Sequence, residues 1–147
     1  AHATLVDIST DAFDYGKQVA DEKGLSAKVH FIQGDARDEK TVRDLLDRPP
    51  DLVKLHGISE DLQDEQIVSI AQAMAAVMPK DKHIVFNSIS PRHGTDRFFR
   101  RVFGLNMIHR SPKHLQELMQ EAGFADFVSI PEPLGVYHVI VGRRQAN

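Results

Sequence analysis

Two aspartates and a histidine stand where the first three apolar segments of the sequence end. Asp7 closes the first segment, Asp35 follows the second, and His56 follows the third. If the segments are neighbouring strands, the carboxylates can accept hydrogen bonds from ribose hydroxyls and from an adenine amino group. An aspartate at a strand end is also typical of a cap on the following helix. Both interpretations stay open at this stage.

Strand and helix patterns alternate along the chain and would bring these positions to one edge. We predict strands at 3–8, 27–32, 51–55, 83–87, 126–130 and 136–141, and helices at about 12–23, 39–46, 63–78, 95–103 and 112–122. This alternation indicates an α/β fold with an open, mainly parallel sheet and helices on both faces. The linker between the last two strands is too short for a helical crossover, so they should form an antiparallel hairpin. We expect residues 1–147 to be a single domain, with the strand 3–8 buried.

The amino-acid composition excludes several classes of function for this protein. The 147 residues carry a formal net charge of −3 and are 41% hydrophobic, with no cysteine. Disulfides and cysteine metal sites are therefore excluded, and the eight histidines show no HxH or HExxH spacing, so no metal is expected. A net negative charge argues against a general nucleic-acid or membrane-surface binder. No apolar run approaches the roughly 18 residues of a membrane span, and we expect a cytoplasmic protein.

Residues 91–110 combine arginines with aromatic side chains. The arginines are Arg92, Arg97, Arg100, Arg101 and Arg110, and the aromatic residues are Phe98, Phe99 and Phe103. A basic, aromatic lid over an anionic or lipid-like substrate is one interpretation. We favour a plainer one, an amphipathic helix with packed phenylalanines and solvated arginines, and we take His93 and His109 as surface residues.

The ordered set of segments resembles the class I S-adenosylmethionine-dependent methyltransferases. Residues 4–9 and 28–36 resemble the tips of that family's second and third strands, and 51–58 with 62–64 resemble its fourth strand and the segment after it. Residues 77–80 with 83–87 resemble its fifth strand, and 121–124 with 141–142 its C-terminal hairpin. The resemblance implies a Rossmann-like fold, S-adenosylmethionine as cofactor, and methyl transfer to an acceptor that is unidentified, whether small-molecule or lipid-like.

The resemblance also implies roles for six residues at the strand tips. Asp7 would bind the ribose hydroxyls, and Ile8 would lie against the face of the adenine. Asp35 would accept a hydrogen bond from the adenine amino group, and Ala36 would lie at the adenine edge. His56 and Gly57 would border the sulfonium and the substrate entrance. A structural histidine at a strand end is the competing interpretation of His56. The sequence identifies no catalytic base.

One departure from the family concerns its glycine-rich loop, which follows the first strand and approaches the methionine end of the cofactor. The nine glycines here are scattered singly, and the first element matches the family's second strand. We interpret the chain as the C-terminal part of a methyltransferase, incomplete at the N-terminus and inactive alone. Its unpaired central sheet edge should promote self-association. The alternatives are an NAD-dependent oxidoreductase of doubly wound fold and a non-catalytic, methyltransferase-like interaction domain.

Overall fold

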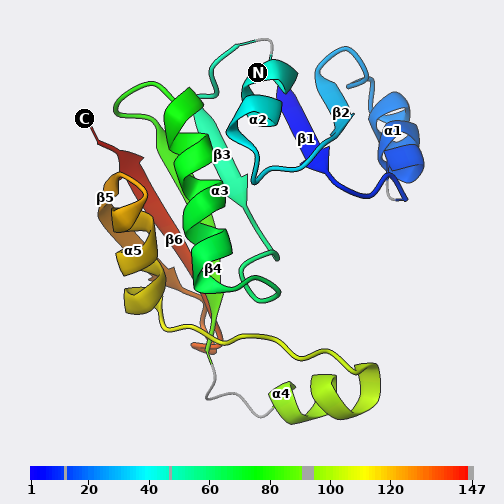
Figure 1. Cartoon of the computed structure of the whole chain (residues 1–147). Helices are drawn as coiled ribbons and strands as arrows, with labels where there is room; N and C mark the ends of the chain where they lie inside the picture. Colours follow the sequence, from blue (N-terminus) through cyan, green and yellow to red (C-terminus); the bar gives the residue numbers. More distant parts are fainter. Residues whose placement is uncertain (12, 47, 91–94, 146–147) are drawn as a thin grey trace.

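A computed structural model describes residues 1–11, 13–46, 48–90 and 95–145 (Figure 1). The expectations for Arg92 and His93 therefore lie outside the described residues. Elements alternate as the sequence pattern predicts, and the α/β class with a C-terminal antiparallel hairpin is confirmed. The strands form two sheets, in the orders β1-β2 and β3-β4-β6-β5.

The smaller sheet pairs β1 (Ala3–Asp7) with β2 (Val29–Gln33) in parallel, with Asp7 opposite Gln33. The helix α1 (Phe13–Glu22) connects them and packs the tilted Phe13 ring against Phe31 at a centroid distance of 5.5 Å. Gly16 permits this approach, because a Cβ at that position would lie 2.6 Å from a ring carbon of Phe31. The second strand begins two residues later than predicted, since a turn in which Leu25 O accepts the Lys28 N–H precedes it.

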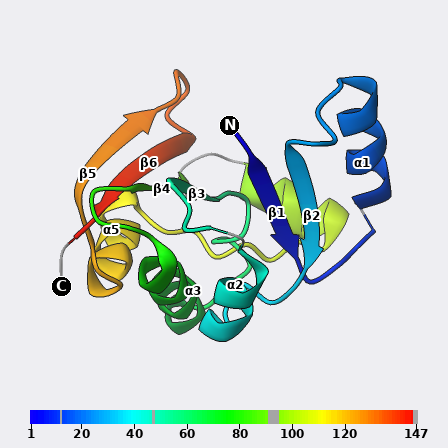
Figure 2. The ribbon, with the colours of Figure 1, turned by 90° about the horizontal axis from the view of Figure 1, so that it is seen from above.

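The strand β1 is exposed, which corrects the prediction of a buried strand. Leu5 is 45% exposed, and Ile8 just beyond the strand is 66% exposed. The physical reason is its second edge: among the described residues, β1 pairs only with β2, and β3 pairs only with β4. Figure 2 shows β1 and β3 facing each other with no described strand between them.

The larger sheet contains β3 (Leu52–Leu55), β4 (His83–Ile89), β5 (Phe124–Pro131) and β6 (Tyr137–Arg144). The first two are parallel, while β6 runs antiparallel to both β4 and β5. Three strands are longer than predicted. In β4 the extra residues are Ser88 and Ile89, and the polar side chains of Asn87 and Ser88 are buried inside the strand.

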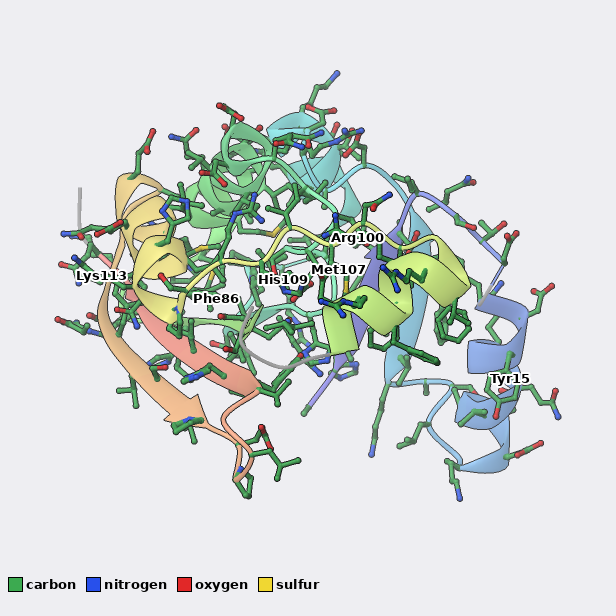
Figure 3. All side chains as sticks on the ribbon, turned by 90° about the horizontal axis from the view of Figure 1, so that it is seen from below. Tyr15, Phe86, Arg100, Met107, His109 and Lys113 are labelled. Carbon is green, nitrogen blue, oxygen red and sulfur yellow. The ribbon has the colours of Figure 1, made fainter. Side chains whose placement is uncertain are left out.

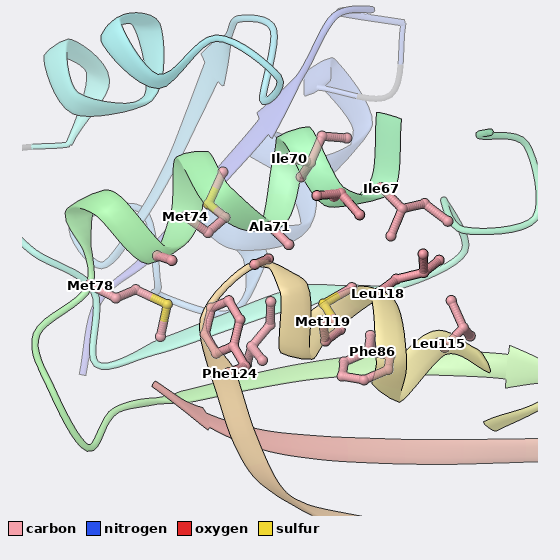
Figure 4. Packing of buried hydrophobic residues seen from close by; sticks show 14 of the residues in the cluster. Ile67, Ile70, Ala71, Met74, Met78, Phe86, Leu115, Leu118, Met119 and Phe124 are labelled. Carbon is pink, nitrogen blue, oxygen red and sulfur yellow. The ribbon is translucent and has the colours of Figure 1, made fainter. Parts of the chain in front are cut away.

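Three helices build the core on one face of this sheet. They are α2 (Glu39–Leu45), α3 (Asp64–Val77) and α5 (Pro112–Glu121). Capping side chains mark the starts of two of them: Asp38 accepts two backbone N–H bonds at the start of α2, and Ser111 accepts one before the proline of α5. Figure 4 shows the apolar side chains of α3 and α5 packed together next to β4. The core cluster that they form with the sheet includes Ile67, Ile70, Met74, Phe86, Leu115, Leu118, Met119 and Phe124.

The arginine and phenylalanine segment projects from this body as α4 (Thr95–Phe98) and a π-helical turn, η1 (Phe99–Phe103) (Figure 1). Phe98, Phe99 and Phe103 pack on one another at centroid distances of 5.6 to 6.0 Å, yet Phe103 remains 60% exposed. The phenylalanines are thus packed among themselves and not into the core. Gly104, at φ 69°, ends the turn in the left-handed conformation.

The structure corrects the prediction that His109 and Arg110, which follow that turn, lie on the surface. Arg110 is 6% exposed, and the side chain of His109 is largely buried. Both lie on the segment that returns from η1 to α5, where they contact residues of other elements instead of solvent.

Candidate functional site

The strand ends that carry the predicted site residues lie at one edge of the molecule. β1, β2, β3 and β4 all end there, and β6 begins there because it runs opposite to β4, with Tyr137 paired to Ile89. Figure 3 views the molecule from this side and shows the segment between α4 and α5, with Met107 and His109, crossing the edge. In open α/β sheets this edge is where ligands bind.

Asp7 is exposed at the tip of β1 and does not cap α1. One of its carboxylate oxygens accepts the N–H of Ser9 at 2.8 Å, two residues along the chain and before the helix begins. The tips of β1 and β2 are joined by two further bonds, from Gly34 N to Asp7 O and from Gln33 Nε2 to Ile8 O. A carboxylate and an exposed isoleucine therefore stand side by side at this tip.

Asp35 is bound by Arg37. The guanidinium donates to both carboxylate oxygens at 2.6 to 3.1 Å, and the Arg37 N–H donates at 2.9 Å. These hydrogen bonds, the side-chain bond foremost, lower the pKa of Asp35 to about 2. The cap of α2 is Asp38, so Asp35 is not the helix cap that sequence reasoning left open. Ala36 beside it is partly buried against the main core.

His56 follows β3 directly and is exposed. Its ring lies against that of Tyr137, with 5.7 Å between the centroids, and the phenol oxygen is 3.0 and 3.1 Å from the two ring nitrogens. Gly57 adopts a positive φ of 69° and donates its N–H to Asn87 Oδ1 at 2.9 Å. The chain thus turns sharply after the imidazole and is held there by β4.

A buried polar network lies under the loop that follows Gly57. Asn87 donates to Glu60 Oε1 at 2.6 Å, Ser59 Oγ donates to Asn87 O at 3.2 Å, and Glu60 O accepts the Ile108 N–H at 2.7 Å. Asn87, Ser59 and Glu60 are all buried. Sequence reasoning missed this network, although a polar pair inside the apolar run of β4 was a visible signal.

Arg110 fixes the far end of the same loop. Its guanidinium donates to Ser59 O at 2.5 Å, to Leu62 O at 2.7 Å and to Asp64 Oδ1 at 2.6 Å. Asp64 Oδ2 contacts a ring nitrogen of His114 at 2.8 Å. Burial raises the pKa of Asp64, but the bonds from Arg110 and His114 outweigh it and leave that pKa below its usual value.

The described residues offer neither a metal site nor a membrane span. No group of three or more histidine, aspartate or glutamate side chains there could hold a metal ion. Within the same residues, every helix is too short or too polar to cross a bilayer.

A Rossmann-like sheet with acidic strand tips at one edge and a C-terminal antiparallel hairpin is the fold of S-adenosylmethionine-dependent methyltransferases. A family model described as "Putative methyltransferase" matches residues 1–144, and the chain belongs to this family. The comparison with curated proteins gives no match.

Solved structures of low sequence identity share the fold. A possible exported protein from Bordetella parapertussis superposes with a TM-score of 0.77 at 15% identity, covering 99% of this chain and 54% of that one. The N,N-8-amino-8-demethyl-D-riboflavin dimethyltransferase RosA from Streptomyces davawensis gives 0.77 at 18% identity, with 99% and 43% coverage. The S-adenosylmethionine-dependent methyltransferase SibL gives 0.76 at 15%, with 99% and 44% coverage. The chain therefore spans about half the length of these structures, and neither alternative, the oxidoreductase or the interaction domain, gains support.

Proposed function

We propose that this chain supplies the adenosine-binding edge and the C-terminal half of an S-adenosylmethionine-dependent methyltransferase that acts on a small molecule. The observation that carries the proposal is the exposed carboxylate of Asp7 at the tip of β1, on the same edge as His56. Family membership supports the reaction class, and the riboflavin-type substrate of one structural neighbour supports a small-molecule acceptor.

The residues at this edge fit the adenosine half of the cofactor. Asp7 can accept from ribose hydroxyls, since an ionised carboxylate has about four acceptor sites and Ser9 uses one. Ile8 presents an apolar side chain to an adenine face. The carboxylate of Asp35 already accepts from Arg37, so an adenine amino group would donate to a carboxylate that is ion-paired. Ala36 lies next to Asp35 in the chain. The cofactor, when bound, supplies a methyl group activated on sulfur.

His56 is the group at this edge that we propose takes a proton from the acceptor. Its imidazole is exposed, whereas His109 on the crossing segment is largely buried and contacts Asp96 at 3.0 Å. A general base must reach the proton it removes, and a ring at the end of β3 borders both the adenosine edge and Gly57. Alignment of the acceptor with the methyl group then supplies most of the rate.

Calorimetric titration with S-adenosylhomocysteine, with NAD as control ligand, tests the cofactor assignment. The titration is run on the 147-residue chain and on the chain extended at its N-terminus by a first strand and a glycine-rich loop. We expect S-adenosylhomocysteine to bind the extended form, and Asp7→Asn to weaken it about tenfold by removing one charge-assisted bond. Asp11→Asn, also exposed and four residues away, is the matched control. Preference for NAD, or equal affinities for the two variants, contradicts the proposal.

A further inference from the structure

The loop that follows β3 carries a buried carboxylate to which the proposed function assigns no role. Glu60 is 5% exposed, and its Oε1 accepts the side-chain N–H of Asn87 at 2.6 Å. Its second oxygen, Oε2, accepts no hydrogen bond from the described residues and is not enclosed by them. Glu60 therefore keeps one carboxylate oxygen available to a bound molecule.

The negative charge of this carboxylate has no opposite charge beside it in the described part of the chain. No described lysine, arginine or histidine forms an ion pair with Glu60, and the buried cation of the same loop, Arg110, pairs with Asp64 instead. The charge acts on the site nonetheless, because it adds to the effect of burial in raising the pKa of Tyr137. A buried charge without a partner is costly, and such groups are commonly found where a protein binds or reacts.

Asn87 holds this carboxylate next to the turn that follows His56. The Gly57 N–H can only donate, so it fixes the amide oxygen of Asn87 and turns the amide NH2 group toward Glu60. The backbone oxygen of Glu60 accepts the N–H of Ile108, in the segment between α4 and α5 that crosses the strand ends in Figure 3. Glu60 is thus held between the His56 turn and the crossing segment, at the edge where we propose that the cofactor binds.

We propose that Glu60 supplies the negative charge that recognises the sulfonium of S-adenosylmethionine. This inference rests on the proposed function and deepens it. A sulfonium carries a fixed positive charge and no N–H group, so it needs a nearby negative charge and not a set of hydrogen-bond acceptors. S-adenosylhomocysteine is a neutral thioether, so Glu60 attracts the methyl donor and not its product. The edge therefore distinguishes two ligands that differ by one methyl group and one charge.

Calorimetric titration of both ligands into the extended form measures this discrimination without any methyl acceptor. We expect Glu60→Gln to weaken S-adenosylmethionine on the order of tenfold and to leave S-adenosylhomocysteine at its parental affinity. Glutamine retains a side-chain oxygen that can accept from Asn87, so the substitution removes the charge and keeps the hydrogen bond. Parental affinity for the neutral ligand also verifies that the variant is folded.

The same loop contains a matched control. Asp61 follows Glu60 directly and is exposed, so Asp61→Asn removes an equal charge that solvent already screens and should change neither affinity. Equal losses for both ligands in Glu60→Gln would show that the residue holds the loop and does not sense charge. Unchanged affinities in Glu60→Gln, or a loss of the same size in Asp61→Asn, would also overturn the proposal.

A measurement on the parent protein does not depend on the folding of any variant. We expect the extended parent to prefer two cations over S-adenosylhomocysteine: S-adenosylmethionine itself, and sinefungin, in which an amine-bearing carbon replaces the sulfonium. A parent that binds the neutral ligand at least as tightly as both cations overturns the role of Glu60 and leaves the proposed function standing. If no form binds any of the three ligands, the proposed function fails and this inference fails with it.

Discussion

Arg110→Met should destabilise the protein far more than any exposed arginine would. Methionine approximates the length of the side chain but donates no hydrogen bond. The substitution leaves the carbonyl oxygens of Ser59 and Leu62 without the donors they have now, and it removes the charge opposite Asp64. Both carbonyls belong to the loop between β3 and α3, so the substitution should destabilise the connection between the sheet and α3.

The magnitude follows from the burial of these groups. An unsatisfied buried acceptor costs about 1–3 kcal/mol. The substitution creates one at Ser59 O and a second, only partly buried, at Leu62 O. Loss of the pair with Asp64 adds about 1 kcal/mol or less, because that carboxylate is 40% exposed and solvent screens its charge. Together these losses should lower the free energy of unfolding by about 2–5 kcal/mol.

Urea unfolding followed by circular dichroism measures this difference. The matched control is Arg100→Met, because Arg100 makes an exposed i,i+4 pair with Asp96 at 3.2 Å and should lose no more than about 0.5 kcal/mol. The midpoint of Arg110→Met should shift strongly at an unchanged slope. If its unfolding free energy lay within about 1 kcal/mol of the parent, or equalled that of Arg100→Met, the network would not hold the loop as we describe.

Three further predictions concern the core, the acid limb and the sheet edge. Leu115→Ala, at a side chain 1% exposed between α3 and β4, should cost about 2–5 kcal/mol in urea unfolding; a loss no larger than that of Lys113→Ala would contradict the packing. Asp35 has a pKa lowered from 3.8 to about 2, so its stabilising effect is complete above pH 4 and lost as the pH falls toward 2. Asp35→Asn should therefore flatten the fall in unfolding free energy across that window, and an unaltered profile would show that the Arg37 pair contributes nothing. The 147-residue chain should self-associate as its concentration rises in sedimentation velocity, and Leu5→Lys in β1 should reduce that association. A parent chain that stays monomeric at all concentrations would contradict association through the unpaired sheet edge.

Elements were predictable because their signals are local. The helical spacing of Ile67, Ile70 and Met74 places α3 within a residue or two of its observed bounds. The antiparallel hairpin followed from the length of its linker alone. The burial of β1 was not predictable, since whether a strand is covered depends on what lies beside it and not on its own residues.

The site divides in the same way. The position of Asp7 and His56 at strand ends follows from where apolar runs stop. The contact of Asp35 with Arg37 was not predicted, although it spans only two residues. Arg110 and Tyr137 escaped sequence reasoning because their partners lie 46 to 81 residues away. An arginine among other arginines and phenylalanines has the composition of a solvated helix, and only tertiary structure distinguishes the buried member of that set.

The separation of the two sheets has a consequence for ligand binding. Among the residues that the structure describes, the module β1-α1-β2 shares no strand pairing with β3-β4-β6-β5, while α2, which follows β2 in the chain, packs into the main core through Val42. Asp7 belongs to the first module and His56 to the second. A ligand that contacts both must therefore also fix the two modules against each other, so its binding free energy includes their docking. The affinity for such a ligand therefore depends on how firmly the two modules are held together. A strand inserted between them should raise that affinity without contacting the ligand.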